Sequence, residues 1–344
     1  MNSVKKIIRN VFIFVVLIVV TFIIIFKNYN IKNTINMIGN ANIGYILLAF
    51  LCMIIYFIAD GLNNKSILEG LGKKISLLQS IKYPVIGFFF SGITPAAGGG
   101  QPMQVYFMSK DDIPSSFGTL SLLVQLITFH VVTLLFGIFG AIFNHKILTG
   151  GMIILFAVGI FLKSITMIVM YVCFRNRYAG KKIVGFVFKI LKKFKVKNLE
   201  EKEEQAYLVI EDYNNGAKYI RKHKKILIKS LCIVCLQMIA YYTLPYFVYR
   251  SFGLSYYSWI EILTIQAVLY VSVASIPLPG SVGVSEGAFL SLYEYIFGTE
   301  LLASAMLINR GISFYLFIIV GALLTIYTVF RNSTKNKDSK EKSK

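Results

Sequence analysis

Long apolar segments separated by short polar and basic ones dominate the pattern of this chain. Alone or with their polar flanks, six of them reach the length of about 20 residues that a helix needs to cross the hydrocarbon core of a bilayer. These predicted spans are Val11–Phe26, Ile43–Ala59, Phe117–Phe143, Met152–Phe174, Ile226–Tyr249 and Leu301–Phe330. The pattern therefore predicts an all-α integral membrane protein with about six transmembrane helices.

Two further apolar regions, Ile81–Met108 and Ile260–Phe297, are interrupted by glycine and proline. The interruptions contain Pro95, Gly98, Gly99, Gly100 and Pro102 in the first region, and Pro277, Pro279, Gly280 and Gly283 in the second. Backbone that is not helical needs cover from protein or water inside a bilayer, because its N–H and C=O groups require partners. Paired broken helices in two halves of a chain point to a transport site near the membrane midplane. The four prolines are predicted to act as structural breaks between half-helices.

The distribution of basic residues predicts the sidedness of these segments. The 36 Lys and Arg residues exceed the 16 Asp and Glu residues, giving a net charge of +20. In a soluble protein this excess would suggest a nucleic-acid partner. Here it flanks apolar runs, where it orients the chain and attracts anionic lipid, so no nucleic acid is expected to bind directly. Basic segments at 5–9, 65–74 and 175–225 are then all cytoplasmic.

This sidedness requires two re-entrant hairpins. Region 81–108 must enter and leave from the cytoplasmic face, and region 260–297 from the outside, as in an inverted repeat. We expect one polytopic domain over 1–332, with both termini cytoplasmic, in a bacterial plasma membrane. The basic tail 333–344 is predicted to be disordered. Within the connector 175–225, residues 181–197 suit an interfacial helix on an anionic leaflet, or an extension of the preceding span.

Two charged residues in the second half of the chain are candidates for chemistry. Arg310 lies well inside the last apolar run, where a charge costs at least about 2.5–3.5 kcal/mol, so a functional role is favoured. Its planar fork suits a phosphate or carboxylate. The alternatives are a structural pair with a carboxylate of the second break, or extension to the outer face. Glu286 either caps the following half-helix or holds a cationic group or a proton.

Neutral donors surround the first break. The run Gly98–Gly100 leaves backbone N–H groups accessible, and such nests at half-helix N-termini attract anions. Gln101 and Gln104 add side-chain donors. One or two glycines would suffice for a tight turn, so three in succession indicate the approach of a ligand.

Three other polar residues lie within or at the ends of the apolar runs. Lys163 either lines a cavity or extends to the surface, and Gly159 beside it allows close helix packing. His130 is predicted to be an interior histidine with satisfied hydrogen bonds. Asp60, at the end of the second span, is predicted to lie at the membrane interface.

Metal, cofactor and nucleotide sites are not expected. Cys232 and Cys235 have a metal-like spacing, but no second Cys/His pair accompanies them, and a structural zinc site needs four ligands. The chain contains no Gly-x-x-x-x-Gly-Lys-Ser/Thr loop, which excludes ATP hydrolysis by that route.

The segments TPAAGGGQPMQVYFMSKDD (94–112), IPLPGSVGVSEGAF (276–289) and NRGISFY (309–315) resemble the flippase-like membrane domain of lysylphosphatidylglycerol synthases. The resemblance extends over about 11–330. It implies movement of a phospholipid between leaflets and roles for Gly98, Gly99, Gly100, Pro102, Gly280, Gly283, Glu286 and Arg310. Many relatives carry a basic residue where Gln104 stands, which shifts the expected phosphate contact towards Arg310. No segment of these 344 residues corresponds to the family's cytosolic lysyl-transferring domain.

The sequence thus predicts translocation of a phospholipid, such as phosphatidylglycerol or its lysyl derivative, or of another lipid-linked cargo. The predicted substrate-binding residues are Gly98, Gly99, Gly100, Gln101, Gln104, Gly280, Gly283, Glu286 and Arg310. An enzymatic alternative is phosphatidylglycerol lysyltransferase activity with a separate partner chain that supplies the transferase domain. A third alternative is a membrane scaffold that organises an envelope enzyme without transporting anything.

Overall fold

The computed structural model describes residues 2–27, 29–145, 150–175, 223–274 and 276–341, together with Leu148 and scattered positions between 178 and 211. Within these ranges every regular element is helical. The long helices outside the two hairpins are α1 (Asn2–Ile25), α3 (Ile43–Gly70), α6 (Ser115–Phe143), α7 (Gly150–Arg175), α10 (Lys224–Ser251) and α13 (Leu316–Glu341). The prediction of an all-α membrane protein is confirmed.

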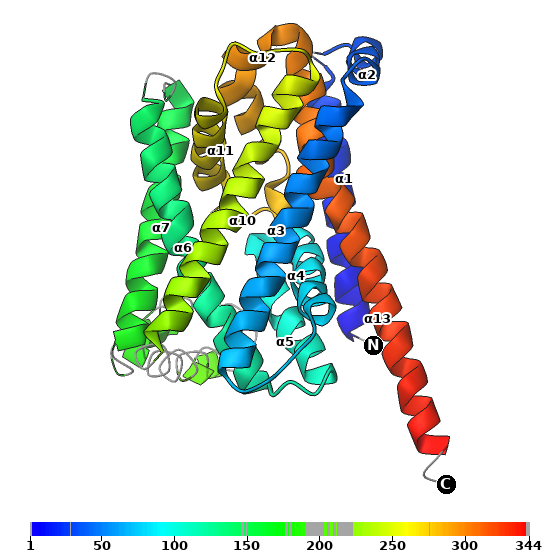
Figure 1. The fold of residues 1–344 in the computed structure, drawn as a ribbon, viewed down its shortest axis with the longest axis vertical. Helices are drawn as coiled ribbons and strands as arrows, with labels where there is room; N and C mark the ends of the chain where they lie inside the picture. The colour runs from blue at the N-terminus through cyan, green and yellow to red at the C-terminus, as the bar shows by residue number, and fades with distance from the viewer. Residues whose placement is uncertain are drawn as a thin grey trace.

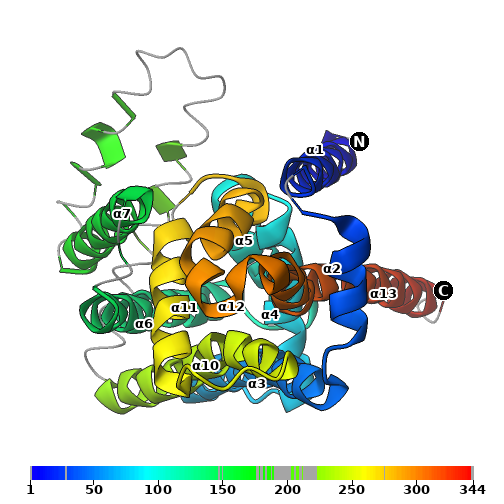
Figure 2. The same ribbon diagram turned by 90° about the horizontal axis from the view of Figure 1, so that it is seen from above.

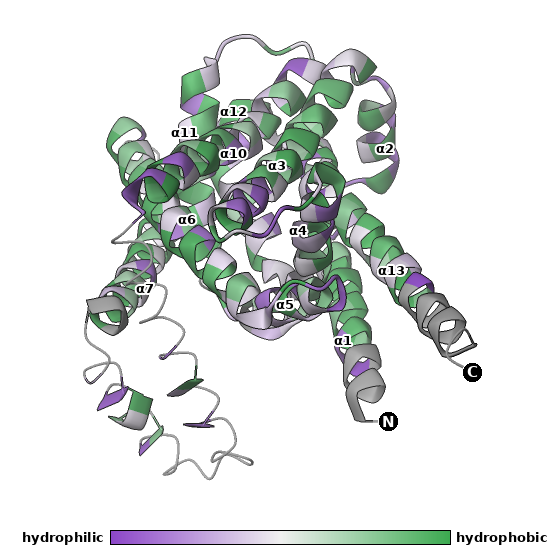
Figure 3. Ribbon diagram, turned by 60° about the horizontal axis from the view of Figure 1, so that its bottom comes forward, coloured by the Kyte–Doolittle hydropathy of each residue, from purple (hydrophilic) through white to green (hydrophobic). Residues whose placement is uncertain are grey.

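Among the described residues, five segments are long and apolar enough to cross a membrane: Ile43–Gly70, Ser115–Phe143, Gly150–Val172, Lys224–Ser251 and Pro279–Arg331. Arg9–Ile25, the apolar part of α1, is a shorter helix. Apolar residues predominate along α1, α6, α7 and α13 in Figure 3, and large apolar side chains such as Phe161 and Leu323 are exposed there. Exposure of this kind on a multi-helix protein is what a lipid environment requires.

The first predicted hairpin consists of α4 (Leu77–Gly92), a 3₁₀ turn η1 (Pro95–Ala97) and α5 (Gly100–Lys110). Its two halves touch closely, because a Cβ atom added to Gly100 would lie 2.0 Å from the Ser91 hydroxyl oxygen. Both halves lie in the lower part of the molecule in Figure 1. The chain therefore enters and leaves this hairpin from one end of the bundle, as the sequence predicts.

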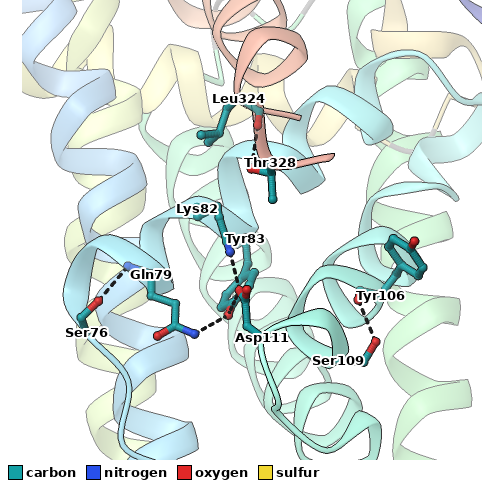
Figure 4. A network of polar contacts seen from close by, with 9 residues as sticks. All are labelled: Ser76, Gln79, Lys82, Tyr83, Tyr106, Ser109, Asp111, Leu324 and Thr328. Atoms are coloured by element: carbon teal, nitrogen blue, oxygen red, sulfur yellow. Dashed lines mark hydrogen bonds and ion pairs between the residues drawn. The ribbon is translucent and has the colours of Figure 1, made fainter. Parts of the chain in front are cut away.

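Side chains at the base of this hairpin join its ends. Lys82 of α4 forms an ion pair with Asp111, just after α5, and the Tyr83 hydroxyl donates to Asp111 Oδ2 at 2.7 Å. The Gln79 amide donates to the Tyr83 hydroxyl at 3.1 Å, and Ser76 caps α4 by accepting from the Gln79 N–H. Figure 4 shows this network close to the end of α5. The network therefore ties the start of α4 to the end of α5.

The second predicted hairpin consists of α11 (Trp259–Val273), η2 (Pro279–Ser281) and the first part of α12 (Val284–Arg310). A capping box between Ser258 and Glu261 starts α11. Gly298 has a non-helical conformation (φ 66°, ψ 164°) that interrupts α12. In Figure 1 the hairpin occupies the upper part of the molecule, opposite the first one.

The two hairpins meet tip to tip, since η1 contacts η2. Helices α3 and α10 pack against each other beside them, as Figures 1 and 2 show. The N-terminus, the C-terminus, the end of α7 and the start of α10 all lie towards the lower end in Figure 1. This arrangement confirms two opposed re-entrant hairpins, whereas the assignment of the lower end to the cytoplasm stays a prediction.

Some features differ from the sequence prediction. A short helix, α2 (Ile31–Gly39), follows α1, and Asn30 caps its N-terminus. Helix α2 packs on α12, where the Ser304 hydroxyl donates to the Thr34 carbonyl. Helix α3 continues past Ala59 because its polar end is buried, where the Ser121 hydroxyl donates to Asn64 Oδ1 at 2.8 Å. The tail expected to be disordered continues α13 as helix to Glu341. Most of the predicted interfacial segment 181–197 lies outside the described residues.

Candidate functional site

An ion pair within the membrane-spanning part joins the second break to the last span. Arg310 Nε lies 2.8 Å from Glu286 Oε1, and Arg310 Nη2 donates to the Gly280 carbonyl at 3.2 Å. The Arg310 guanidinium also stacks on the Phe314 ring, 4.4 Å from its centroid. Arg310 therefore connects three parts of the hairpin and compensates a charge that would otherwise be costly to bury.

Glu286 is fully buried and both of its oxygens are occupied. Its Oε1 also accepts from the Tyr315 hydroxyl at 2.8 Å, and its Oε2 accepts from the Gly283 N–H at 2.7 Å. The second contact caps the first turn of α12, where an acidic side chain stabilises a helix. Of the two roles that the sequence left open for Glu286, the geometry favours the structural one.

A π-helical turn over Gly311–Tyr315 explains how two residues of one helix reach the same carboxylate oxygen. The π-helix has i→i+5 spacing, so it places Arg310 and Tyr315 on one face. Such turns occur as single insertions within α-helices, frequently at functional sites. No pattern in the sequence predicted this turn.

The glycines of the second break meet conformational and packing demands. Gly280 has a φ of +58°, and a Cβ atom there would lie 2.2 Å from the Phe314 ring. Gly283 has a φ of +87° at the N-cap of α12. Left-handed backbone of this kind favours glycine. Pro279 begins η2, as Pro95 begins η1, which agrees with the predicted role of these prolines.

A cavity of about 310 Å³, here called the Arg310 cavity, lies beside this ion pair. Its lining includes Gly280, Ser285, Asn309, Arg310 and Ser313 from the second hairpin and its continuation, with Tyr241, Gln266 and Phe314 around them. Asn309 Oδ1 is buried without a hydrogen-bond partner in the part of the chain that the structure describes. The cavity thus combines a guanidinium, small hydroxyls and aromatic rings.

A larger cavity of about 580 Å³, here called the Lys163 cavity, adjoins it. Most of its polar lining residues lie on five helices. They are Asp60 and Asn63 of α3, Gln101 and Gln104 of α5, Gln125 and His130 of α6, Lys163 and Thr166 of α7, and Gln237 of α10. The two cavities share the lining residues Tyr56, Ser91, Ala97, Tyr270 and Ala274. They therefore meet where the two breaks meet.

The residues predicted at the first break separate into two groups. Gly98, Gln101, Pro102 and Gln104 line the Lys163 cavity. Gly99 and Gly100 are instead constrained by packing, because a Cβ atom on Gly99 would lie 2.8 Å from Thr94 Cγ2. The Gly99 N–H donates to the Thr94 hydroxyl at 2.9 Å. Packing alone therefore accounts for Gly99 and Gly100, and their contact with a ligand stays a prediction.

Two expectations about polar residues on the spanning helices are wrong. His130 Nδ1 is buried without a partner among the described residues, so this histidine is not satisfied. Asp60 lines the Lys163 cavity and does not end the second span, because α3 continues to Gly70. The missed signal is that Asp60 and Asn63, three residues apart, share one face of an apolar helix. Within the described residues, no group of three or more His, Cys, Asp or Glu side chains could hold a metal ion.

Comparison with known proteins places the chain in a family. The family model described as "Lysylphosphatidylglycerol synthase TM region" matches residues 7–321. A "UPF0104 membrane protein" of Archaeoglobus fulgidus is 25% identical over 318 residues, which cover 90% of this chain and 94% of that protein. Its counterpart in Methanothermobacter thermautotrophicus is 24% identical over 301 residues, covering 85% of this chain and 86% of that protein. Both relatives are archaeal, so the bacterial source stays a prediction. The chain belongs to the family of lysylphosphatidylglycerol synthase transmembrane regions, as its motifs predict.

Proposed function

We propose that this chain translocates a phospholipid, such as phosphatidylglycerol or its lysyl derivative, or another lipid-linked cargo, between the leaflets of a membrane. One observation carries the proposal: two cavities, each with charged and polar residues in its lining, adjoin where two opposed broken helices meet. A charged headgroup is costly to place in hydrocarbon. A polar route through the protein removes much of that cost while the acyl chains stay in the bilayer.

Arg310 would contact the phosphate of the headgroup in the Arg310 cavity. Glu286 engages its Nε atom and the Gly280 carbonyl engages Nη2, while the guanidinium still contributes to the cavity lining. A planar guanidinium held in one orientation is well suited to phosphate oxygens. In this mechanism Glu286 orients Arg310, and it does not bind a cation of the headgroup. Without a nucleotide-binding motif in the sequence, transport would run downhill or be driven by an ion gradient or the membrane potential.

Leaflet exchange of fluorescent phosphatidylglycerol and lysyl-phosphatidylglycerol in proteoliposomes tests the proposal. Ala274 lines both cavities, so Ala274→Trp should fill the route and abolish exchange. Ala157 is exposed on α7, and Ala157→Trp should leave exchange unchanged. Exchange that survives Ala274→Trp would contradict a route through these cavities.

The same variants separate the proposal from a scaffold role. Co-purification with a separate transferase or envelope enzyme would be the readout of a scaffold. A scaffold would keep its partner in the Ala274→Trp variant, because that side chain lines the two cavities. Loss of exchange with retained co-purification would therefore assign the cavities to transport.

A further inference from the structure

Lys163 is held inside the bundle by close helix packing. It lies on α7, four residues after Gly159, where an added Cβ atom would be 2.2 Å from the Val271 carbonyl oxygen. This approach brings α7 against α11, and only 3% of the Lys163 surface is exposed. A lysine on a spanning helix often extends its long side chain towards the membrane surface. The Lys163 side chain instead points into the protein, where burying its charge is costly unless a partner compensates it.

The contacts of Lys163 leave its charge without a counter-ion. Its Nζ donates to the Thr133 hydroxyl at 2.8 Å and lies 5.4 Å from the centre of the Tyr270 ring. Among the described residues, no carboxylate lies within 4.0 Å of this nitrogen. A lysine ammonium has three donors, of which Thr133 accepts one. Arg310, by contrast, is paired with Glu286.

The walls of the Lys163 cavity carry further polar groups without partners. Within the described part of the chain these are Asn63 Oδ1, Gln104 Oε1, Gln125 Nε2 and His130 Nδ1. Buried polar atoms are normally hydrogen-bonded. All four of these atoms belong to side chains that line one space, so a polar ligand in it would supply the missing partners once the side chains rotate towards it. Its volume of about 580 Å³ lies within the range of ligand pockets.

The charges of the lining restrict the chemistry of a ligand. Lys163 and the Gln125 amide offer donors to an anion, whereas Asn63 and Gln104 offer acceptors. Asp60 is the carboxylate of the lining, and it forms no ion pair with Lys163 among the described residues. A bare anion would leave these acceptors unpaired. A ligand that carries an anionic group and, beside it, hydroxyl or ammonium donors would satisfy both sets.

We infer that the Lys163 cavity is a binding subsite for a phosphate-bearing headgroup with hydroxyl or ammonium donors, and that Lys163 is its anion anchor. The inference rests on the proposed function in that a membrane lipid supplies the phosphate. Five shared lining residues connect this subsite to the Arg310 cavity. The headgroup would therefore occupy two cationic positions in succession, one on each side of the contact between the breaks.

Equilibrium binding to the full-length chain in a neutral detergent tests the inference. Dioctanoyl-phosphatidylglycerol is titrated by isothermal calorimetry, with inorganic phosphate and uncharged dioctanoylglycerol as separate probes. Lys163→Met should weaken phosphatidylglycerol binding about tenfold or more, a change of roughly 1.4 kcal/mol. Lys163→Arg should restore most of the affinity because it restores the charge. Lys110→Met removes an exposed lysine at the end of α5 and should change nothing.

The outcomes are distinct for this inference and for the proposed function. Unchanged phosphatidylglycerol affinity in Lys163→Met would overturn the subsite, even where leaflet exchange is observed. Lost affinity in that variant would support the subsite, even where the unaltered chain shows no exchange and the proposed function fails. Inorganic phosphate that binds as tightly as the lipid would overturn a lipid source. Should Lys163→Met not fold, Gln125→Leu is the alternative variant, because it removes a lining amide and keeps the Lys163 charge. A loss of phosphatidylglycerol affinity of about threefold or more in Gln125→Leu would support the subsite. An unchanged affinity in that variant would contradict it.

Discussion

Hairpin α11–α12 is held by an ion pair at its tip, whereas hairpin α4–α5 is held by one at its base. Glu286 and Arg310 lie beside the second break and are almost completely buried. Lys82 and Asp111 lie where the first hairpin enters and leaves the bundle, and both side chains are about one-fifth exposed, at 19% each. The tip of the first hairpin instead presents neutral groups, Gly98, Gln101 and Gln104, to the Lys163 cavity.

This difference indicates that the two hairpins have different roles. The second break is held by several side-chain contacts, because each oxygen of Glu286 is engaged and Gly280 touches Phe314. The first break relies on backbone and hydroxyl contacts such as those of Thr94. A cation held by several contacts and an adaptable set of neutral donors would together suit a site that must bind a headgroup and release it.

The largest effect should come from breaking the buried ion pair. Glu286→Ala leaves Arg310 buried without a counter-ion, and such changes cost about 3–5 kcal/mol. We expect a strongly lowered midpoint of thermal unfolding in detergent. Glu294→Ala, which removes an exposed glutamate of the same helix, is the matched control. Equal midpoints for the two variants would show that the tip of the second hairpin is not held by this pair.

The next effect should come from Gly280. Gly280→Ala places a Cβ atom at a left-handed backbone position, at a cost of about 1–3 kcal/mol, and drives it into the Phe314 ring. Gly287→Ala, with no neighbouring atom within 4 Å of the added Cβ, should be neutral or slightly stabilising. The free energy of unfolding, measured by denaturant titration, compares them. A neutral Gly280→Ala would contradict the close packing of η2 on the last span.

A smaller loss is expected at the base of the first hairpin. Asp111→Asn removes the charge that Lys82 and Tyr83 share. Charged hydrogen bonds contribute about 1.5–3 kcal/mol, and partial exposure reduces this to roughly 1–2 kcal/mol. Proteolysis of the loop at 111–114 should become faster, since the ends of the hairpin are less tightly joined. Unchanged proteolysis would mean that the base is held by packing alone.

The smallest effect should be found at the surface pair Lys65–Glu69, which spans one turn of α3 at 3.4 Å. Exposed pairs of this type contribute about 0.3–0.5 kcal/mol. Glu69→Gln should therefore change the free energy of unfolding by less than about 0.5 kcal/mol. A larger loss of unfolding free energy would show that this surface pair contributes as much as the ion pairs of the hairpins. It would contradict the distinction between buried and surface pairs.

Much of the architecture could be predicted from the sequence because two strong signals coincide. Glycine and proline interrupt apolar runs at 92–102 and 275–283, and the basic segments leave each broken region with both ends on one side. Arg310 and Glu286 could be identified as candidates because charges within apolar runs are costly. The sequence predicted an ion pair between them only as one of several alternatives for Arg310. Arg310 and Tyr315 both reach Glu286 because a π turn separates them, and no sequence pattern indicated that turn.

The Lys163 cavity could not be predicted in the same way. Asp60, His130 and Lys163 lie on three helices separated by long stretches of sequence, and the periodicity of one helix does not reveal which helix it faces. Close contact of Gly159 with α11 decides that Lys163 turns inward. The same limit applies to the glycine run 98–100. A glycine required by close packing and a glycine that lines a cavity cannot be distinguished in the sequence.

Leaflet exchange of phosphatidylglycerol in proteoliposomes, measured for the unaltered chain and for Ala274→Trp and Ala157→Trp, tests the central claim most directly. We predict exchange by the unaltered chain and by Ala157→Trp, and none by Ala274→Trp, whose side chain would fill the junction of the two cavities. Equal exchange by all three would contradict the claim that lipid headgroups pass between the two broken helices.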